Sequence, residues 1–342
     1  MRVRSLLPAL AALVAAACST DEVAAPPTPL AAGTMTVDAA TGWVYVRLAD
    51  SARVVPTPSA RESGAWDIAF FATNVTLNGG QAGPGGVTGA CLCQNSAQAP
   101  TAAQWLAMTP ASERADFDSV TRVPATASFT SDRLTPSLAG WFTGNGASAV
   151  AAPDSLAFVR LSDSSGVAKL RVTRLDGATA TSPGRVTIEY ATAAFADAAF
   201  GATRTATLDA TAGAVAFDLQ TGQPTTSPTD WDVRVEGFAI LVNGGVSGPG
   251  RGAAARVRGT TFAAATPTAT AANAYRVDAF AGIFGTARFF NYNLGGDNRI
   301  APTYDVYFIR RGSTTWKLQI IDYYSPTGTP RVITFRYAPV AG

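Results

Sequence analysis

The chain carries two copies of one sequence pattern, and this internal repeat restricts its possible folds more than any other feature. Residues 66–90 read WDIAFFATNVTLNGGQAGPGGVTGA, and residues 231–255 read WDVRVEGFAILVNGGVSGPGRGAAA. At a constant spacing of 165 residues, the Trp-Asp, Asn-Gly-Gly and Gly-Pro-Gly motifs coincide. Three further pairs of segments match in the same order, namely 36–48 with 207–219, 167–172 with 315–320, and 185–190 with 331–337. Four ordered matches indicate a tandem duplication, which predicts one domain at residues 35–192 and a second at residues 205–340.

Within each copy, apolar residues alternate with polar ones over short stretches, which is the period of a half-buried β-strand. In the second copy, Trp231, Val233 and Val235 are apolar and the residues between them are charged. The phase of this alternation changes after Glu236 and, in the first copy, after Phe70, which predicts a bulge or corner. Asn-Gly at 78–79 and at 243–244 then predicts tight turns with positive φ.

Helical periodicity is scarce in this sequence. The best candidate is residues 101–117, TAAQWLAMTPASERADF, which Pro110 interrupts. Near the C-terminus, alternating apolar residues at 316–320 and 333–337 flank a turn at 325–330, which predicts a hairpin. We therefore predict an all-β fold class for each copy, with mainly antiparallel sheets and little helix.

The first residues, MRVRSLLPALAALVAAAC, have the features of a bacterial secretion signal. Arg2 and Arg4 precede an apolar run that is too short to cross a membrane as a helix. Small residues then lead to Cys18, as in the lipobox of lipoproteins, although Ala15 stands where Leu is usual. We predict a lipoprotein signal peptide at 1–17, lipidation of Cys18, and a Pro/Ala-rich tether at 18–34. The alternative is an ordinary signal peptide followed by an unrelated Cys.

Two further cysteines, Cys91 and Cys93, are separated by one residue. In an oxidising compartment they can form a disulfide or remain as two thiols. A disulfide at this spacing closes a tight ring, and the chain offers no His as a partner for a metal site. We therefore predict a local disulfide and no metal site.

The absence of histidine from the chain excludes several chemistries. Ser-His-Asp and Cys-His catalysis and ligation of zinc or haem by imidazole all need this residue. Removal of the signal peptide would take Arg2 and Arg4 from the 26 basic side chains, so the remaining 24 balance the 24 acidic side chains. No charge excess remains to attract nucleic acid. The NGGxxGPG loops lack the GK[ST] of a P-loop and predict structural turns instead of phosphate sites.

Three of these features together resemble the HmuY-like family of bacterial surface lipoproteins. The first is the strand that opens with Trp-Asp and runs into Asn-Gly-Gly-x-x-Gly, which is present twice. The second is the aromatic segment FFNYN at 289–293, and the third is the C-terminal YDVYFIRRGSTTWKLQIIDYY followed by ITFRY. The second copy fits along nearly its whole length, whereas the first fits more loosely, with WFTGNG at 141–146 in place of FFNYN.

This resemblance implies a mainly β fold, a lipid anchor in the outer membrane, and capture of haem for delivery to an uptake system. Residue 19, directly after Cys18, is Ser and not Asp, which also favours the outer membrane by analogy with lipoprotein sorting. The implied partners are haem or a haem-carrying protein and an outer-membrane receptor. Relatives classically hold the iron with two His, one of which lies a few residues after the aromatic segment. Here residues 295–299 read GGDNR, so the match carries no bis-histidyl haem site.

Other side chains can in principle contact haem. Met and Tyr are possible axial ligands, which makes Met108 and Tyr292 candidates, and Arg299 is a candidate partner for a propionate. Each has an ordinary structural alternative: a Met that fills a core gap, a buried strand aromatic, and a solvated loop Arg.

Three functions remain open at this level. The first is a haem or porphyrin-binding protein with non-histidine ligation, which is not an enzyme. The second is a duplicated surface lipoprotein that has lost haem binding and has a structural or adhesive role. The third is a hydrolase with paired carboxylates, but Asp67 and Asp232 start equivalent strands, which favours a structural hydrogen bond for each.

Overall fold

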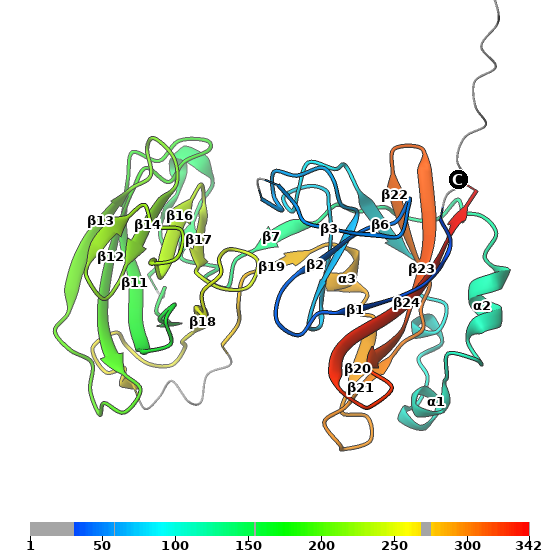
Figure 1. The fold of residues 1–342 in the computed structure, drawn as a ribbon. Helices are drawn as coiled ribbons and strands as arrows, with labels where there is room; N and C mark the ends of the chain where they lie inside the picture. The colour runs from blue at the N-terminus through cyan, green and yellow to red at the C-terminus, as the bar shows by residue number, and fades with distance from the viewer. Residues whose placement is uncertain (1–30, 58, 154, 268–274, 342) are drawn as a thin grey trace, which may run out of the picture.

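The computed structural model describes residues 31–57, 59–153, 155–267 and 275–341. Its strands form two groups joined by a short two-stranded ribbon (Figure 1). The long strands pair antiparallel, and helices are few, so the predicted mainly antiparallel all-β fold is confirmed. None of the helices in the described residues is long and apolar enough to cross a membrane. The predicted signal peptide at 1–17 and Cys18 lie outside the described residues.

The first group, here called the terminal body, takes its strands from both ends of the chain. A five-stranded sheet has the order β1-β24-β23-β22-β6, and a four-stranded sheet has the order β3-β2-β4-β5. The strands of the terminal body are β1 (Gly33–Asp38), β2 (Val44–Arg47), β3 (Ala52–Val54), β4 (Ile68–Phe71), β5 (Asn74–Leu77), β6 (Thr88–Cys91), β22 (Tyr307–Arg311), β23 (Thr314–Tyr324) and β24 (Pro330–Val340).

The second group, here called the central body, is built from the middle of the chain. Its sheets have the orders β13-β12-β11-β10-β18 and β15-β14-β16-β17. The strands of the central body are β10 (Ala157–Arg160), β11 (Gly166–Asp176), β12 (Arg185–Ala194), β13 (Arg204–Asp209), β14 (Val215–Asp218), β15 (Gln223–Thr225), β16 (Val233–Glu236), β17 (Ala239–Val242) and β18 (Ala253–Arg256).

Smaller elements connect and flank the two bodies. The ribbon between them pairs β7 (Arg133–Thr135) with β19 (Ala279–Ala281). Two short hairpins pair β8 (Phe142–Thr143) with β9 (Val150–Ala151), and β20 (Phe290–Tyr292) with β21 (Ile300–Pro302). The helices are η1 (Ser96–Gln98), α1 (Ala102–Ala107), α2 (Arg114–Ser119), η2 (Gly146–Ser148) and α3 (Ile283–Thr286). The helical segment predicted at 101–117 is thus present as α1 and α2, on either side of Pro110.

Each body has its own apolar core. In the terminal body, the rings of Phe70 and Phe335 stack with centroids 5.0 Å apart, and Ile333 and Tyr337 are buried beside them. This burial of every second residue in β24, and its pairing with β23, confirms the predicted C-terminal hairpin. The buried apolar residues of the central body form a cluster of their own. Because full burial of each such side chain contributes about 1.5–3 kcal/mol, each body is stabilised by its own core.

The packed bodies do not follow the predicted domains at 35–192 and 205–340. β1 pairs with β24 at the far end of the chain, with Thr36 opposite Thr334. Conversely, β18 from the second predicted domain pairs with β10 from the first. A strand edge pairs with any complementary edge that reaches it, whatever their separation in sequence, so a repeat boundary need not be a packing boundary. β1 also begins at Gly33, inside the tether predicted at 18–34.

At both places where a bulge or corner was predicted, the chain makes a complete hairpin turn. β4 reverses into β5 through Ala72, with φ of 50°, and β16 reverses into β17 through Gly237, with φ of 53°. A two-residue reversal changes the phase of the apolar alternation as a bulge does, which is why the sequence pattern alone did not separate the two.

The positive φ predicted at the Asn-Gly turns lies one residue later, at Gly80 (61°) and Gly245 (63°). The side chain of Asn78 is fully buried, and its Nδ2 donates to the carbonyls of Ser63 and Trp66 while its Oδ1 accepts from the N–H of Gly85. Asn78 therefore organises the glycine loop from inside with its side chain, and the glycine after the Asn-Gly pair makes the turn.

Candidate ligand-binding cleft

A cavity of about 410 Å³ lies where the terminal body meets a loop of the central body. Trp43 and Tyr45, at the start of β2, and Trp66, just before β4, line it from the terminal body. The rings of Tyr45 and Trp66 meet edge to face with centroids 5.1 Å apart, and those of Trp43 and Tyr45 lie 6.5 Å apart. The segment 245–249 of the central body lines the same cavity. The wall on the terminal body is therefore aromatic, with Trp43 and Tyr45 partly exposed and Trp66 buried.

A second cavity of about 290 Å³ lies beside the first. Both are lined by Trp43, Thr76, Val246 and Phe280, and the second extends to Phe284, Phe290 and Arg288. Phe280 belongs to β19 of the ribbon, so the ribbon lines the space between the bodies. We call the two adjacent cavities the interbody cleft. Its size and aromatic lining match those of sites for flat organic ligands.

Two arginines line the interbody cleft, and one of them is paired with a carboxylate. Arg61 lines the first cavity, and its Nη2 lies 3.4 Å from Oε1 of Glu236, which links the terminal body to the central body. Arg288 lines the second cavity. Burial raises the pKa of Tyr45, so its phenol is protonated at neutral pH and disfavoured as a phenolate ligand. The cleft therefore suits a flat aromatic ligand that carries anionic groups.

The predicted haem contacts Tyr292 and Arg299 lie together on the β20–β21 hairpin. The backbone N–H of Asn293 donates to the carbonyl of Arg299 at 2.7 Å. Tyr292 is 59% exposed instead of being a buried strand aromatic, and its hydroxyl donates to Asn298 Oδ1 at 3.0 Å. The guanidinium of Arg299 stacks over the ring of Tyr324 at 4.2 Å.

Met108 does not join these two residues. It is half-buried at the C-terminal end of α1, where its N–H donates to the carbonyl of Trp105. In the described part of the chain, Met108 lines neither the interbody cleft nor the cavity of about 460 Å³ beside Tyr292. That cavity shares Arg288 and Phe290 with the interbody cleft, so Tyr292 lies next to the cleft and not inside it.

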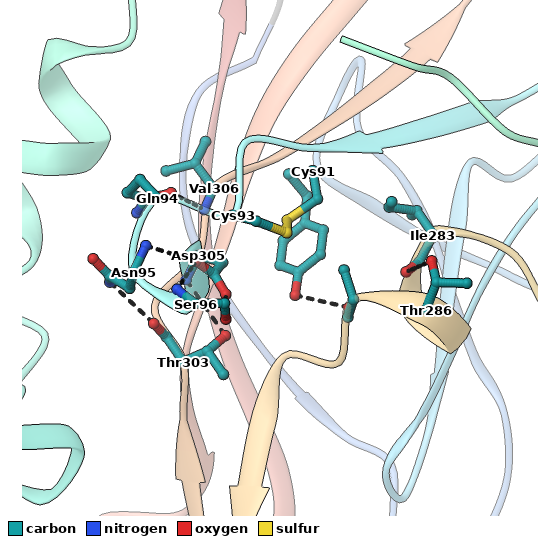
Figure 2. Close-up of a disulfide and its surroundings, with 12 residues drawn as sticks. Cys91, Cys93, Gln94, Asn95, Ser96, Ile283, Thr286, Thr303, Asp305 and Val306 are labelled. Carbon is teal, nitrogen blue, oxygen red and sulfur yellow. Dashed lines mark hydrogen bonds between the residues drawn. A yellow bond between two sulfur atoms is a disulfide. The ribbon is translucent and has the colours of Figure 1, made fainter. Parts of the chain in front are cut away.

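Cys91 and Cys93 form a disulfide at the end of β6 (Figure 2). The chain that follows is held by Asp305, whose Oδ1 accepts from the N–H groups of Asn95 and Ser96 at 3.0 and 3.1 Å. Asp305 Oδ2 also accepts from the Ser96 hydroxyl. The disulfide therefore belongs to a clamp that fixes the end of β6 against the approach to β22.

The two carboxylates considered for hydrolysis lie in different bodies. Asp67 accepts from the N–H of Leu48 and forms an ion pair with Arg311 at 2.7 Å. Asp232 accepts from the N–H groups of Leu219 and Ser162. Both side chains are 1% exposed and accept hydrogen bonds from backbone N–H groups of loops, so they do not form the carboxylate pair of a hydrolase.

The aromatic residues of the cleft were missed by sequence reasoning, although the repeat contains a signal for them. In the matched segments 36–48 and 207–219, Trp43 and Tyr45 stand where the second copy has Ala214 and Ala216. A strand that is aromatic in one copy and small in the other indicates a surface used in only one copy.

Comparison with known proteins identifies part of the chain. Residues 39–190 match the family model described as HmuY protein. No curated protein matches the chain. Among solved structures, a candidate lipoprotein from Bacteroides fragilis is 12% identical, with a TM-score of 0.32, and the match covers 90% of this chain and 89% of that one.

Two further structures are also distant. The apo HmuY analog of Tannerella forsythia is 10% identical with a TM-score of 0.29, over 92% of this chain and 98% of that one. A candidate HmuY-like haem-binding protein from Bacteroides vulgatus is 12% identical with a TM-score of 0.17, over 45% of this chain and 90% of that one. These low TM-scores leave the family model as the finding that identifies residues 39–190.

Proposed function

Since the chain belongs to the HmuY family through residues 39–190, we propose that it is a lipid-anchored protein that binds haem or a related porphyrin in the interbody cleft. The family is one of haem-binding transport proteins and not of enzymes. The observation that carries the choice of site is the wall of Trp43, Tyr45, Trp66 and Phe280, with Arg61 beside it.

A porphyrin has the properties that this cleft selects. Its flat face stacks on aromatic rings, which contributes about 0.5–1.5 kcal/mol for each ring beyond the burial of apolar area. Its two propionates pair with guanidinium groups. Arg288 lines the second cavity, and Arg61 lines the first, where a propionate has to compete with Glu236. We expect most of the affinity to come from stacking and ion pairing.

Axial ligation of the iron by Met108 or Tyr292 stays a prediction. The position of Tyr292, exposed beside a cavity that adjoins the cleft, is compatible with contact to a ligand that extends from the cleft. Arg299 is engaged with Tyr324, so a propionate at this hairpin has to compete with that ring.

Anchoring completes the proposed role. A lipidated Cys18 holds the protein in the outer membrane, and the receptor that accepts the haem is an outer-membrane partner. Replacement of Cys18 with Ser tests this part, because the variant should leave the membrane fraction. A variant that stays in the membrane fraction refutes the lipid anchor.

We also propose that the chain arose by tandem duplication. Equivalent hydrogen bonds support this. Asn243 Nδ2 donates to the carbonyls of Thr229 and Trp231 and its Oδ1 accepts from Gly250 N–H, as Asn78 does in the other body. Lys169 and Lys317, which are the only lysines, both donate to the carbonyl of a phenylalanine. Such agreement of buried polar contacts is not expected of unrelated β domains.

Titration of the purified protein with haemin tests the proposed function. We expect a saturable shift of the Soret band, and a loss of affinity of about tenfold in Trp43→Ala, which corresponds to about 1.4 kcal/mol. Phe195→Ala, which removes an exposed aromatic of the central body, is the matched control and should bind as wild type does. Met108→Ala and Tyr292→Phe test axial ligation through the position of the band.

Two outcomes decide against this proposal. If Tyr292→Phe alone abolishes the shift while Trp43→Ala binds normally, the ligand lies at the hairpin cavity and the cleft is wrong. If wild-type protein gives only a featureless, unsaturable spectrum, the alternative of a structural or adhesive lipoprotein that has lost haem binding takes its place.

A further inference from the structure

We propose that the two copies have exchanged their C-terminal halves, so that each body is assembled from the first half of one copy and the second half of the other. The first halves run from β1 to β6 and from β13 to β18, and the second halves run from β10 to β12 and from β22 to β24. This inference rests on the proposed duplication and is independent of any ligand.

The order of strands in the two large sheets carries the inference. In both sheets, three consecutive strands of one second half lie between two strands that come from a single first half. In the terminal body, β24, β23 and β22 of the second copy lie between β1 and β6 of the first. In the central body, β12, β11 and β10 of the first copy lie between β13 and β18 of the second. The two sheets are therefore the same sheet, built with opposite combinations of halves.

Hydrogen bonds between the halves agree in detail. The hydroxyls of Thr36 and Thr334 lie 3.0 Å apart across β1 and β24, and those of Thr187 and Thr207 lie 3.3 Å apart across β12 and β13. Thr36 and Thr207 match by sequence repeat, and so do Thr187 and Thr334. In the structure, each threonine is therefore paired with a threonine of the other copy. That partner is equivalent to the threonine that its own copy would supply.

The buried lysines cross between copies in the same way. Lys317, in the second copy, donates to the carbonyl of Phe117 in the first copy at 2.6 Å and lies 4.4 Å from the centroid of that ring. Lys169, in the first copy, donates to the carbonyl of Phe262 in the second at 2.8 Å and lies 4.6 Å from the centroid of that ring.

The ribbon of β7 and β19 is where the two halves change partners. β7 leads from the first half of copy one into the central body, and β19 leads from the first half of copy two back into the terminal body (Figure 1). The two strands pair antiparallel with Leu134 opposite Phe280 at the centre. This is the arrangement of hinge strands in an exchanged dimer, here within one chain.

The residues before the two hinge strands are fixed alike. The carbonyl of Asp132 accepts from Gln81 N–H at 2.9 Å, and its carboxylate accepts from Leu77 N–H at 2.9 Å. The carbonyl of Asp278 accepts from Val246 N–H at 3.1 Å, and its carboxylate accepts from Val242 N–H at 2.9 Å. Each hinge is thus anchored to its own first half before it crosses.

Engineered cysteine pairs in the full chain separate the exchanged from the unexchanged arrangement. In a Cys18→Ser background, Thr36→Cys with Thr334→Cys should form an intrachain disulfide, and so should Thr187→Cys with Thr207→Cys. In the unexchanged arrangement, two other double variants should form disulfides instead, namely Thr36→Cys with Thr187→Cys, and Thr207→Cys with Thr334→Cys. Mild oxidation of folded protein followed by peptide mapping under non-reducing conditions identifies the bonds.

Each result decides the question. Near-complete 36–334 and 187–207 bonds, with little of the other two, support the exchange. A 36–187 or 207–334 bond, failure of both expected bonds in cooperatively folded protein, or a 36–334 bond between two chains overturns it. The two experiments have separate readouts, since the cysteine pairs report which strands are neighbours without any haemin and the titration reports binding without any engineered cysteine. A failed exchange with a saturable Soret shift, or the reverse, therefore tells the two proposals apart.

Discussion

Replacement of Asn78 with Ala should unfold one body more easily and leave the other intact. The side chain is fully buried and makes three hydrogen bonds, at 2.9 Å to the carbonyl of Ser63, 2.8 Å to that of Trp66, and 3.0 Å from Gly85 N–H. Alanine leaves all three backbone groups without this partner. At about 1 kcal/mol net for each hydrogen bond, the free energy of unfolding of the terminal body should fall by about 3 kcal/mol.

Guanidinium denaturation with hydrogen exchange read by mass spectrometry measures this loss body by body. With an m value of roughly 4 kcal/mol/M, a loss of about 3 kcal/mol moves the midpoint of the terminal body down by roughly 0.7 M. Peptides from β1–β6 and β22–β24 should lose protection together, although they lie far apart in sequence, because they form one body.

Asn243→Ala is the matched variant, because Asn243 makes the equivalent bonds at 2.6, 2.9 and 2.9 Å in the central body. It should lower the protection of peptides from β10–β18 instead. A loss below about 1 kcal/mol in Asn78→Ala, or equal loss of protection in both bodies, would refute the reasoning that this side chain stabilises one body through its three bonds.

Two further predictions concern single side chains of the terminal body. Gly79→Ala places a Cβ 1.9 Å from the carbonyl oxygen of Val87 and should cost about 1–3 kcal/mol, whereas Gly64→Ala meets open space and should stay within about 0.5 kcal/mol of wild type in the same denaturation assay; equal effects would contradict the clash. Burial raises the pKa of the Asp132 carboxyl above 3.8, so the folded state binds this proton more tightly than the unfolded state. The stability that this group contributes is therefore largest below pH 3.8, and it is lost as pH rises through the folded-state pKa. Asp132→Asn should therefore lose less stability than wild type between about pH 4 and 7 in thermal melts, and parallel pH profiles would disprove this assignment.

The sequence predicts the local structure of this protein well and its long-range pairing poorly. Alternation of apolar residues identified β24, where Ile333, Phe335 and Tyr337 are buried, because that pattern depends only on which face of a strand is covered. The partner of β1 was not predictable in this way. Under the proposed duplication, Thr187 and Thr334 are equivalent residues, so either one satisfies Thr36, and local sequence does not distinguish them.

The interbody cleft illustrates a second limit of the sequence. Trp43 and Phe280 are far apart along the chain and line the same space only because the ribbon brings the bodies together. Motif reasoning instead selected Tyr292 and Arg299 from a family segment, and these lie together on a hairpin beside the cleft. Only the departure of Trp43 from Ala214 in the repeat pointed to the cleft.

The pairing of β1 with β24 also sets the order in which the protein is completed as the chain leaves the ribosome from its N-terminal end. All strands of the central body have emerged once β18 ends at Arg256, so this body can close while the chain is still being delivered. β1 and β6 must wait for β22–β24, the last strands to arrive. Until then their unpaired edges are exposed to other chains, so a chaperone would be needed most during that interval.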